Sequence, residues 1–204
     1  MRYSKIWSVV LALLVVAGLS GCTVIFQKGR RTDVEKISKL KSELSELERA
    51  KQELENRLKD EINNKQVKVE MQDKGLVITF VAEVLFDSGK AVLRNDSQPK
   101  LEKVVSVLNT TVADLNIGIE GHTDNQPIKK SGWKSNWELS TARSLSVLHF
   151  LSEKGVTEPR MAATGYGEYK PVAGNDSKAG RQKNRRVEIV ILPKTEKVNT
   201  QAEQ

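Results

Sequence analysis

A carboxylate and a guanidinium in the second half of the chain have the residue types and spacing of a ligand-binding pair. Asp124 comes just after the segment 115–120, in which apolar and polar residues alternate as in a half-buried strand. Asn136 and Arg143 are seven residues apart, on one face of the helix that is predicted to follow the next loop. A carboxylate binds an ammonium group, and the planar fork of an arginine binds a carboxylate bidentately. Brought together across this junction, the side chains could grip a ligand that carries both an amine and a carboxylate.

The elements that position these residues are indicated by capping signals and apolar periodicity. Ser135 and Glu138 form an S-x-x-E capping box, which predicts a helix over 136–154 that Gly155 ends. A second helix is predicted over 97–112, with a proline in its first turn. Alternating segments predict strands at 66–71, 76–81, 115–120, 160–164 and 186–192, with 84–86 continuing or restarting the second. We expect an α/β (α+β) two-layer sandwich of βαβαββ order, with a mixed sheet, two main helices on one face and an antiparallel edge permitted by the last loop.

Five sequence motifs follow one another in order between residues 84 and 192. They are Leu85-Phe86-Asp87-Ser88-Gly89 with Leu93, Gly121-His122-Thr123-Asp124, Asn136 with Leu139-Ser140-x-Ala142-Arg143, Thr164-Gly165-Tyr166-Gly167, and Asn184-Arg185-Arg186-Val187-Glu188. Together they resemble the C-terminal peptidoglycan-binding domain of outer-membrane protein A and its relatives. These relatives include the peptidoglycan-associated lipoprotein and the flagellar stator B proteins. The resemblance implies the same two-layer fold.

The resemblance also implies roles for individual residues. In the family, the Asp and Arg that match Asp124 and Arg143 hold diaminopimelate of the cell-wall stem peptide. Asn136 lies beside free backbone N–H groups at a helix start, and such groups suit a carboxylate. Second-rank candidates, which orient the site or the fold, are Asp87, Thr123 and Arg185.

Spacing alone leaves simpler roles open for the same residues. Asp124 could be a turn carboxylate, a common role for Asp after a strand. Arg143 could lie on a solvated helix face. His122 is expected to be packed or hydrogen-bonded, because no clustered ligands complete a metal set around it in the sequence. We therefore expect no metal and no cofactor.

The N-terminus has the features of a bacterial lipoprotein signal. Two basic residues precede an apolar run from Ile6 to Leu19, which is shorter than the about 20 residues that a membrane span needs. The following Leu19-Ser20-Gly21-Cys22 resembles the lipoprotein signal in which the cysteine is acylated. We expect a signal peptide at 1–21 and lipidation at Cys22, with an uncleaved membrane helix as the alternative. Because Thr23 and not Asp follows the cysteine, resemblance to sorted lipoproteins favours an outer-membrane anchor that faces the periplasm.

The segment 33–63 contains no Gly or Pro and is rich in Leu, Glu, Lys and Arg, which predicts a long helix. Its apolar residues fall on heptad a and d positions, namely Ile37, Leu40, Leu44, Leu47, Leu54 and Leu58. A coiled-coil stalk, an ordinary amphipathic helix and packing on the globular domain all fit this pattern. A lipidated leader at 22–32 precedes this helix. The globular domain is expected at 65–194 and a disordered tail at 195–204.

The composition excludes several function classes. With 38% hydrophobic and 29% charged residues, the chain is neither a disordered protein nor a multi-span membrane protein. Its net charge is +7, or 31 − 26 = +5 without residues 1–21, which suits an anionic cell-wall polymer and equally a solvated surface with spare lysines. No nucleic-acid motif accompanies that charge. The chain has no G-x-S-x-G, and Ser88-Gly89-Lys90 lacks the upstream glycine of a phosphate-binding loop. We therefore do not expect an enzyme.

The sequence is interpreted as a cell-envelope lipoprotein that binds peptidoglycan through diaminopimelate and tethers a membrane to the cell wall. The loop 125–135 is longer than in the shortest family members and looks more like the stator B branch, so a flagellar stator subunit is the first alternative. A stator needs a proton-binding Asp in its membrane helix, and Ile6–Leu19 contains no acidic residue. The second alternative is a coiled-coil scaffold with a protein partner, localised by its wall-binding domain.

Overall fold

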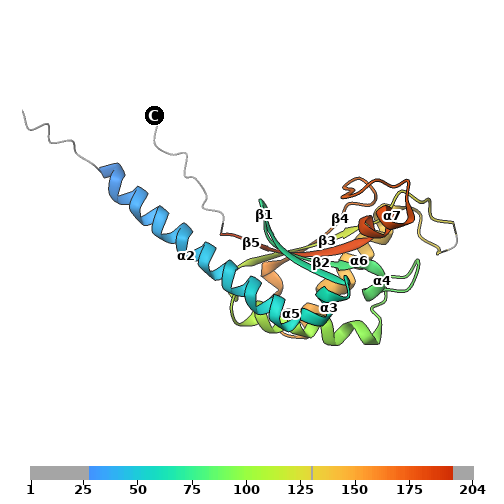
Figure 1. Ribbon diagram of the computed structural model, residues 1–204, viewed down its shortest axis with the longest axis horizontal. Coiled ribbons are helices and arrows are strands. Elements are labelled where there is room, and N and C mark those ends of the chain that lie inside the picture. Colours follow the sequence, from blue (N-terminus) through green and yellow to red (C-terminus); the bar gives the residue numbers. More distant parts are fainter. Residues whose placement is uncertain (1–27, 130, 195–204) are drawn as a thin grey trace, which may run out of the picture. The chain divides into compact units, whose positions relative to one another are not determined.

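The computed structural model describes residues 28–129 and 131–194 (Figure 1). The predicted signal peptide at 1–21, the lipidation site Cys22 and the tail at 195–204 lie outside the described residues. The chain divides into two compact units, 1–39 and 40–204. In the first unit the described part is the beginning of a long helix, and the second unit holds the sheet and the remaining helices. Within the described residues, no helix combines the length and hydropathy that a membrane crossing requires.

A five-stranded mixed sheet with the order β1-β2-β5-β3-β4 forms one layer of the second unit. Its strands are β1 (Val67–Gln72), β2 (Gly75–Val81), β3 (Asn116–His122), β4 (Met161–Gly165) and β5 (Arg186–Leu192). β3 and β4 pair in parallel, and all other neighbours pair antiparallel. The predicted strands and the hairpin of the first two are confirmed, as is the two-layer α/β class.

The sequence permitted an antiparallel edge for the last strand but did not decide its place in the sheet. β5 does not form an antiparallel edge but lies in the centre of the sheet, between β2 and β3. The reason is its composition, because Val187, Ile189 and Ile191 face the core while Val190 is also buried on the other face. A strand that buries residues on both faces is more stable with neighbours on both sides.

A short helix replaces the predicted continuation of the second strand at 84–86. The helix α4 (Ala82–Leu85) begins where β2 leaves the sheet, and Phe86 after it forms an isolated bridge with Leu93. Leu85 and Phe86 are both buried in the hydrophobic core. Turning the chain here therefore buries two adjacent apolar side chains, which a continued strand would direct to opposite faces.

The helices follow the predicted order. They are α2 (Lys28–Arg57), α3 (Lys59–Asn63), α4, α5 (Gln98–Asn109), α6 (Asn136–Glu153) and α7 (Lys178–Asn184), with 3-10 turns at Asn95–Ser97 and Glu158–Arg160. Ser135 caps α6 as predicted, since its side chain accepts a hydrogen bond of 3.3 Å from the backbone N–H of Glu138. Gly155, with a φ of +91°, ends the same helix in a conformation that favours glycine.

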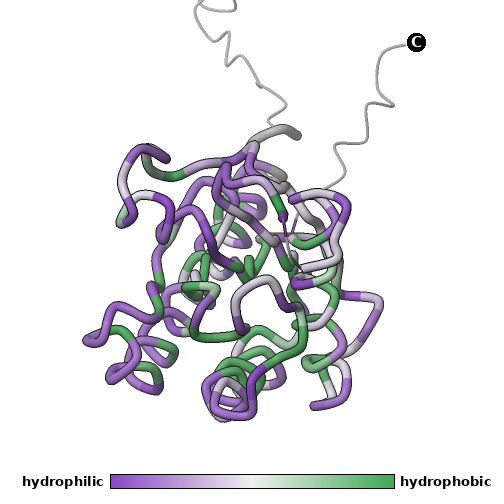
Figure 2. The backbone as a smooth tube through the Cα atoms, turned by 90° about the vertical axis from the view of Figure 1, so that its right-hand side faces the viewer, coloured by the Kyte–Doolittle hydropathy of each residue, from purple (hydrophilic) through white to green (hydrophobic). Residues whose placement is uncertain are grey.

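The core lies between one face of the sheet and the helices, as Figure 1 shows for α5 below the strands. Ile117 and Ile119 of β3 face this core together with Val104 of α5 and Val147 of α6. In Figure 2 the hydrophobic stretches lie toward the middle of the domain and hydrophilic stretches lie at its periphery. The opposite face of β3 therefore carries Glu120 and His122, because side chains alternate along a strand.

The C-terminal half of α2 belongs to the same core. Its apolar residues Leu47, Ala50 and Leu54, with Leu58 after it, are all buried in the cluster that also contains α5. Glu53 accepts a hydrogen bond of 2.6 Å from Thr111 in the turn after α5. The C-terminal half of α2 is therefore packed on the globular domain, which was one of the alternatives for this segment. A boundary between a stalk at 33–63 and a domain at 65–194 would separate these buried residues from the core to which they belong. The helix also begins earlier than predicted, at Lys28.

Candidate ligand-binding site

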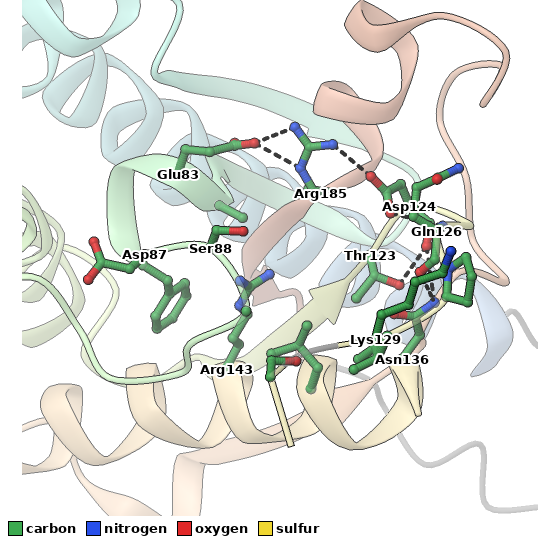
Figure 3. Close-up of a pocket in the computed structure, with 17 residues that line it drawn as sticks. Glu83, Asp87, Ser88, Thr123, Asp124, Gln126, Lys129, Asn136, Arg143 and Arg185 are labelled. Carbon is green, nitrogen blue, oxygen red and sulfur yellow. Dashed lines mark hydrogen bonds and ion pairs between the residues drawn. The ribbon is translucent and has the colours of Figure 1, made fainter. Parts of the chain in front are cut away.

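A pocket of about 500 Å³ opens at the carboxyl end of β3 (Figure 3). Four segments form its walls: α4 with the turn after it, the loop after β3, the first half of α6, and the residue before β5. All six predicted site residues line it, namely Asp87, Thr123, Asp124, Asn136, Arg143 and Arg185. The fold thus brings the six predicted residues together in one pocket, where their contacts distinguish their roles.

Asp124 is held in the pocket by three neighbours. Its side chain is buried, and Oδ2 accepts a hydrogen bond of 2.6 Å from Nη1 of Arg185. Oδ1 accepts one of 3.1 Å from the backbone N–H of Gln126, which is the turn role that spacing alone suggested. The hydroxyl of Thr123 donates to the backbone carbonyl of Asp124 at 2.9 Å. Thr123 therefore orients the loop, and the Asp124 carboxylate is fixed in direction before any ligand arrives.

Arg185 links Asp124 to a second carboxylate, Glu83. Its guanidinium donates to Glu83 through Nε at 2.8 Å and through Nη2 (Figure 3). Burial opposes the charge of Arg185, but its hydrogen bonds to Asp124 and Glu83 outweigh burial and raise its pKa above the ordinary value. Glu83 was not among the predicted site residues, because it belongs to none of the five motifs and lies between the predicted strand segments 76–81 and 84–86.

Arg143 is the most buried cation of the pocket. Only 5% of the residue is exposed, so the solvated helix face that spacing alone left open is wrong for it. Its Nε donates to the carbonyl of Lys90 at 3.0 Å, and its guanidinium carbon lies 5.2 Å from the centroid of the Phe86 ring. Among residues 28–129 and 131–194 it forms no ion pair. Burial lowers the pKa of Arg143 to about 10, which still leaves it charged at neutral pH.

Asn136 connects three parts of the pocket wall. Its side-chain amide donates to Oε2 of Glu168 at 3.1 Å and to the carbonyl of Gln126 at 3.2 Å, with a longer contact of 3.4 Å to the carbonyl of Asp124. These bonds tie the start of α6 to the loop that carries Asp124. The Asn136 side chain therefore positions the site through its protein contacts.

Asp87 lies at the mouth of the pocket, away from the Asp124 carboxylate (Figure 3). Its carboxylate forms exposed ion pairs with Lys90 at 3.0 Å and with Arg94 at 3.3 Å. Exposed pairs of this kind contribute little to stability. Since Lys90 also accepts the hydrogen bond from Arg143, Asp87 acts on the turn that holds Arg143.

The loop 125–135 is fastened to the same turn. The indole N–H of Trp133 donates to the carbonyl of Gly89 at 2.8 Å. Gly89 has a φ of +70°, and a Cβ there would lie 2.7 Å from the Cβ of Ser131. Only glycine fits this close approach. The longer loop that the sequence singled out thus forms a wall of the pocket, where it places Ile128 and Lys129.

The distance between Asp124 and α6 is set by a second glycine. A Cβ on Gly121 of β3 would lie 2.1 Å from the backbone carbonyl oxygen of Ser140, so strand and helix backbones are in direct contact there. Through this contact Asp124, three residues after Gly121, and Arg143, three residues after Ser140, line the same pocket. Burial lowers the pKa of Arg143, and the negative charges of Glu83 and, to a smaller extent, Asp124 oppose that effect.

Comparison with known proteins places this site in a family. The model of the OmpA family matches residues 85–185. Motility protein B of Bacillus subtilis is 45% identical over 150 residues, which are 73% of this chain and 57% of that protein. The outer-membrane lipoprotein YfiB of Pseudomonas aeruginosa is 35% identical over 122 residues, which are 60% of this chain and 70% of that protein. The solved structure of the cell wall anchor of the T6SS from Pseudomonas aeruginosa superimposes with a TM-score of 0.63 and 35% identity, covering 69% of this chain and 97% of that one.

The chain thus spans somewhat more than half the length of Motility protein B, whereas it covers nearly all of the solved wall anchor. The matched region contains all the residues of the pocket except Ala82 and Glu83. Family model, curated relatives and solved structure agree with the motifs that the sequence analysis identified. The chain belongs to the OmpA family.

Proposed function

We propose that this protein binds peptidoglycan non-covalently, through diaminopimelate of the stem peptide, and thereby tethers a membrane to the cell wall. The observation that carries the proposal is Arg143, a buried guanidinium without an ion pair among the described residues, in the same pocket as the fixed carboxylate of Asp124. A relative described as a cell wall anchor supports it. The role is one of binding and not of catalysis, because the pocket offers opposite charges that can hold a zwitterion.

Arg143 binds the carboxylate of the amino-acid end of the diaminopimelate side chain. A buried cation without a partner is costly, and an incoming carboxylate compensates that cost while forming charge-assisted hydrogen bonds. The bond from Nε to Lys90 fixes the guanidinium plane and leaves the two terminal nitrogens for the ligand. Arg143 therefore contributes both affinity and orientation.

Asp124 binds the ammonium group of the same ligand end. Although its Oδ2 already accepts a bond from Arg185, a carboxylate has about four lone-pair sites, so acceptor capacity remains. Glu83, Arg185 and Asp124 form a row of alternating charges. The ligand extends this row with its ammonium and then its carboxylate, which ends on Arg143. A ligand lacking either group breaks the alternation.

The anchor to the membrane is the acylated Cys22, after removal of 1–21, and the membrane is the outer membrane, with the protein facing the periplasm. Similarity to the outer-membrane lipoprotein YfiB supports this placement. Stable attachment requires more than one acyl chain. Palmitate labelling that is lost in Cys22→Ser is the expected result, and equal labelling of both proteins would exclude the lipid anchor.

A flagellar stator subunit is the second candidate, favoured by the 45% identity to Motility protein B. Against it stands the absence of any acidic residue in Ile6–Leu19, since a stator moves protons through a membrane carboxylate. A scaffold role is compatible with wall binding, because Ile37, Leu40 and Leu44 on α2 are exposed and could contact a protein partner. Restoration of swimming in a strain without its stator B protein would favour the stator.

The proposed function is tested by sedimentation with purified peptidoglycan. We expect Arg143→Ala to weaken binding by tens- to thousands-fold, about 2–5 kcal/mol, because the ligand carboxylate loses its buried partner. Arg143→Lys should recover only part of the affinity, since a point charge lacks the fork. The matched control is Arg57→Ala, which removes an exposed arginine of α2 outside the pocket.

The ligand itself is tested by comparing two wall types. Peptidoglycan that carries diaminopimelate should pellet the protein, whereas peptidoglycan with lysine at that position lacks the second carboxylate and should not. An Arg143→Ala protein that is folded by circular dichroism and pellets like the wild type would exclude this site. Equal binding to both wall types would exclude diaminopimelate as the ligand.

A further inference from the structure

A second polar cluster lies on the face of the sheet opposite the core, away from the pocket. Glu120 and His122 are two residues apart on β3 and therefore share this face. Glu188 on β5 pairs directly with Glu120 in the antiparallel register. One ligand atom from each of these three side chains lies within 4.8 Å of the others. The strand pairing thus assembles two carboxylates and an imidazole.

His122 is buried without a hydrogen-bond partner. Its side chain is only 3% exposed, and among the described residues neither ring nitrogen has a hydrogen-bond partner. The ring stacks on Tyr166 at 5.3 Å, which confirms the packed histidine that the sequence predicted. Its Nε2 lies 3.8 Å from Oε2 of Glu120, so it is directed into the cluster. An unsatisfied buried nitrogen is costly and calls for an explanation.

A cation already occupies the space between the carboxylates. The ammonium of Lys74 lies 2.6 Å from Oε2 of Glu120 and 2.6 Å from Oε2 of Glu188. Two like charges directly opposite each other on a sheet repel, so the pair needs such a cation. Lys74 comes from the turn between β1 and β2, and its side chain is 35% exposed. It can therefore leave for solvent, and in its present position it does not satisfy His122.

We propose that Glu120, His122 and Glu188 form a binding site for a divalent cation of the zinc class, which binds by displacing the ammonium of Lys74. An imidazole nitrogen with carboxylate oxygens is a donor set that Zn²⁺ accepts, with water completing the coordination. A hollow of about 340 Å³, lined by all three residues, gives a path from solvent and room for that water. The metal would bind Nε2 of His122, the ring nitrogen directed toward Glu120, which forms no hydrogen bond among the described residues while Lys74 occupies the cluster.

The surroundings keep the donors in the form that a metal needs. Burial opposes ionisation of Glu120, but its contacts with His122 and Lys74 outweigh burial and lower its pKa to about 2. Burial lowers the pKa of His122, so the ring is neutral and has a free lone pair. Arg186 donates to Oε1 of Glu188 at 2.6 Å, which leaves Oε2 directed into the cluster. Partners of this kind orient metal ligands.

The test is a titration of the full chain with Zn²⁺ against a chromophoric chelator, in a Cys22→Ser background so that the lone thiol cannot bind metal. We expect one ion per chain. Lys74→Gln removes the competing ammonium and should tighten binding by about tenfold or more, whereas His122→Phe keeps the stacked ring and should weaken it by at least about 10–100-fold. The matched control is His149→Phe, which replaces the exposed histidine of α6.

A direct readout comes from Co²⁺, whose visible absorption reports coordination by nitrogen and oxygen. The spectrum should appear with wild type and Lys74→Gln and be absent with His122→Phe. If neither the wild type nor Lys74→Gln binds zinc stoichiometrically while both remain folded, the cluster is an ion pair alone and the proposal is overturned. Equal affinity of wild type and His122→Phe would overturn it as well. Neither result bears on the wall-binding pocket.

Discussion

Two charge clusters surround β3, and each lacks a different partner. At the carboxyl end of the strand, Asp124 is paired with Arg185, but the buried Arg143 has no ion pair among the described residues. On the face of the sheet opposite the core, called the open face below, Glu120 and Glu188 share Lys74, but His122 has no hydrogen-bond partner within the part of the chain that the structure describes. The first cluster can accept an anion and the second can accept a cation. In each cluster the side chain without a partner, Arg143 or His122, thus indicates whether the ligand group that binds it is an anion or a cation.

The clusters also differ in what their paired charges contribute to folding. Glu188 is buried between Lys74 and Arg186, and burial opposes its charge while those neighbours lower its pKa overall. Arg143, by contrast, is buried without an ion pair among the described residues, and the proposed function assigns its charge to the ligand. We therefore expect changes in the open-face cluster to alter stability, and changes in the pocket to alter wall binding.

The largest effect is expected for Glu188→Gln. The substitution leaves Arg186, which is 5% exposed in its side chain, without its carboxylate partner. Breaking a buried ion pair in this way costs about 3–5 kcal/mol of folding free energy. Denaturant titration measures the loss. At a temperature where the variant is folded, its wall binding should match that of the wild type. A loss of wall binding under these conditions would show that the open-face cluster also contributes to wall binding.

The opposite pattern is expected for Asp124→Asn. A neutral amide cannot neutralise the ligand ammonium, so wall binding should fall by about 2–5 kcal/mol. Stability should change by only about 1 kcal/mol or less, because Arg185 retains Glu83 and is partly exposed. The control is Asp114→Asn, an exposed carboxylate outside the pocket. Sedimentation and denaturant titration of the same samples separate the two quantities, and a variant that binds like the wild type would remove Asp124 from the site.

Much of this arrangement could be predicted from the sequence, because each piece has a local signal. The S-x-x-E box fixed the start of α6, and alternation fixed the strands, so Asp124 and Arg143 could be placed at one junction. The partner of Asp124 could not be predicted in the same way. Arg185 and Glu83 approach it only because β5 inserts beside β2 and β3, which is a matter of sheet order.

The same limit applies to the open-face cluster and to α2. Glu120 and Glu188 are far apart in sequence, and their register is set by the central place of β5, so the sequence showed His122 without ligands around it. The heptad pattern of α2 indicates an apolar stripe but not what covers it. Leu47 and Leu54 are covered by the domain core, whereas Leu40 and Leu44 are exposed. A fragment that begins at Lys65 would therefore lose part of the core.

Acid should affect the open-face cluster through Glu120. Its pKa is about 2 in the folded protein against 4.5 for the free side chain, because its contacts with His122 and Lys74 outweigh burial. A depressed carboxyl pKa contributes stability that is present above about 4.5 and is lost as the pH falls toward 2. The slope contributed by this one group is at most about 1.4 kcal/mol per pH unit. Glu120→Gln should flatten acid unfolding in this window, and an unchanged profile would show that Glu120 is not the responsible group.

The smallest effect on stability is expected for His122→Phe. Replacing the imidazole with a phenyl ring keeps the stack on Tyr166 and removes two buried nitrogens that have no partner among the described residues. Removal of an unsatisfied polar group by an apolar group of similar shape is nearly neutral or stabilising, so the melting temperature without metal should stay the same or rise slightly. With Zn²⁺ the wild type should have the higher melting temperature of the two proteins, because only the wild type gains stability from a ligand that binds the folded state. A clear loss of stability in His122→Phe without metal would mean that the imidazole already has a favourable partner in the folded protein, and the open-face cluster would then have no group in need of a ligand.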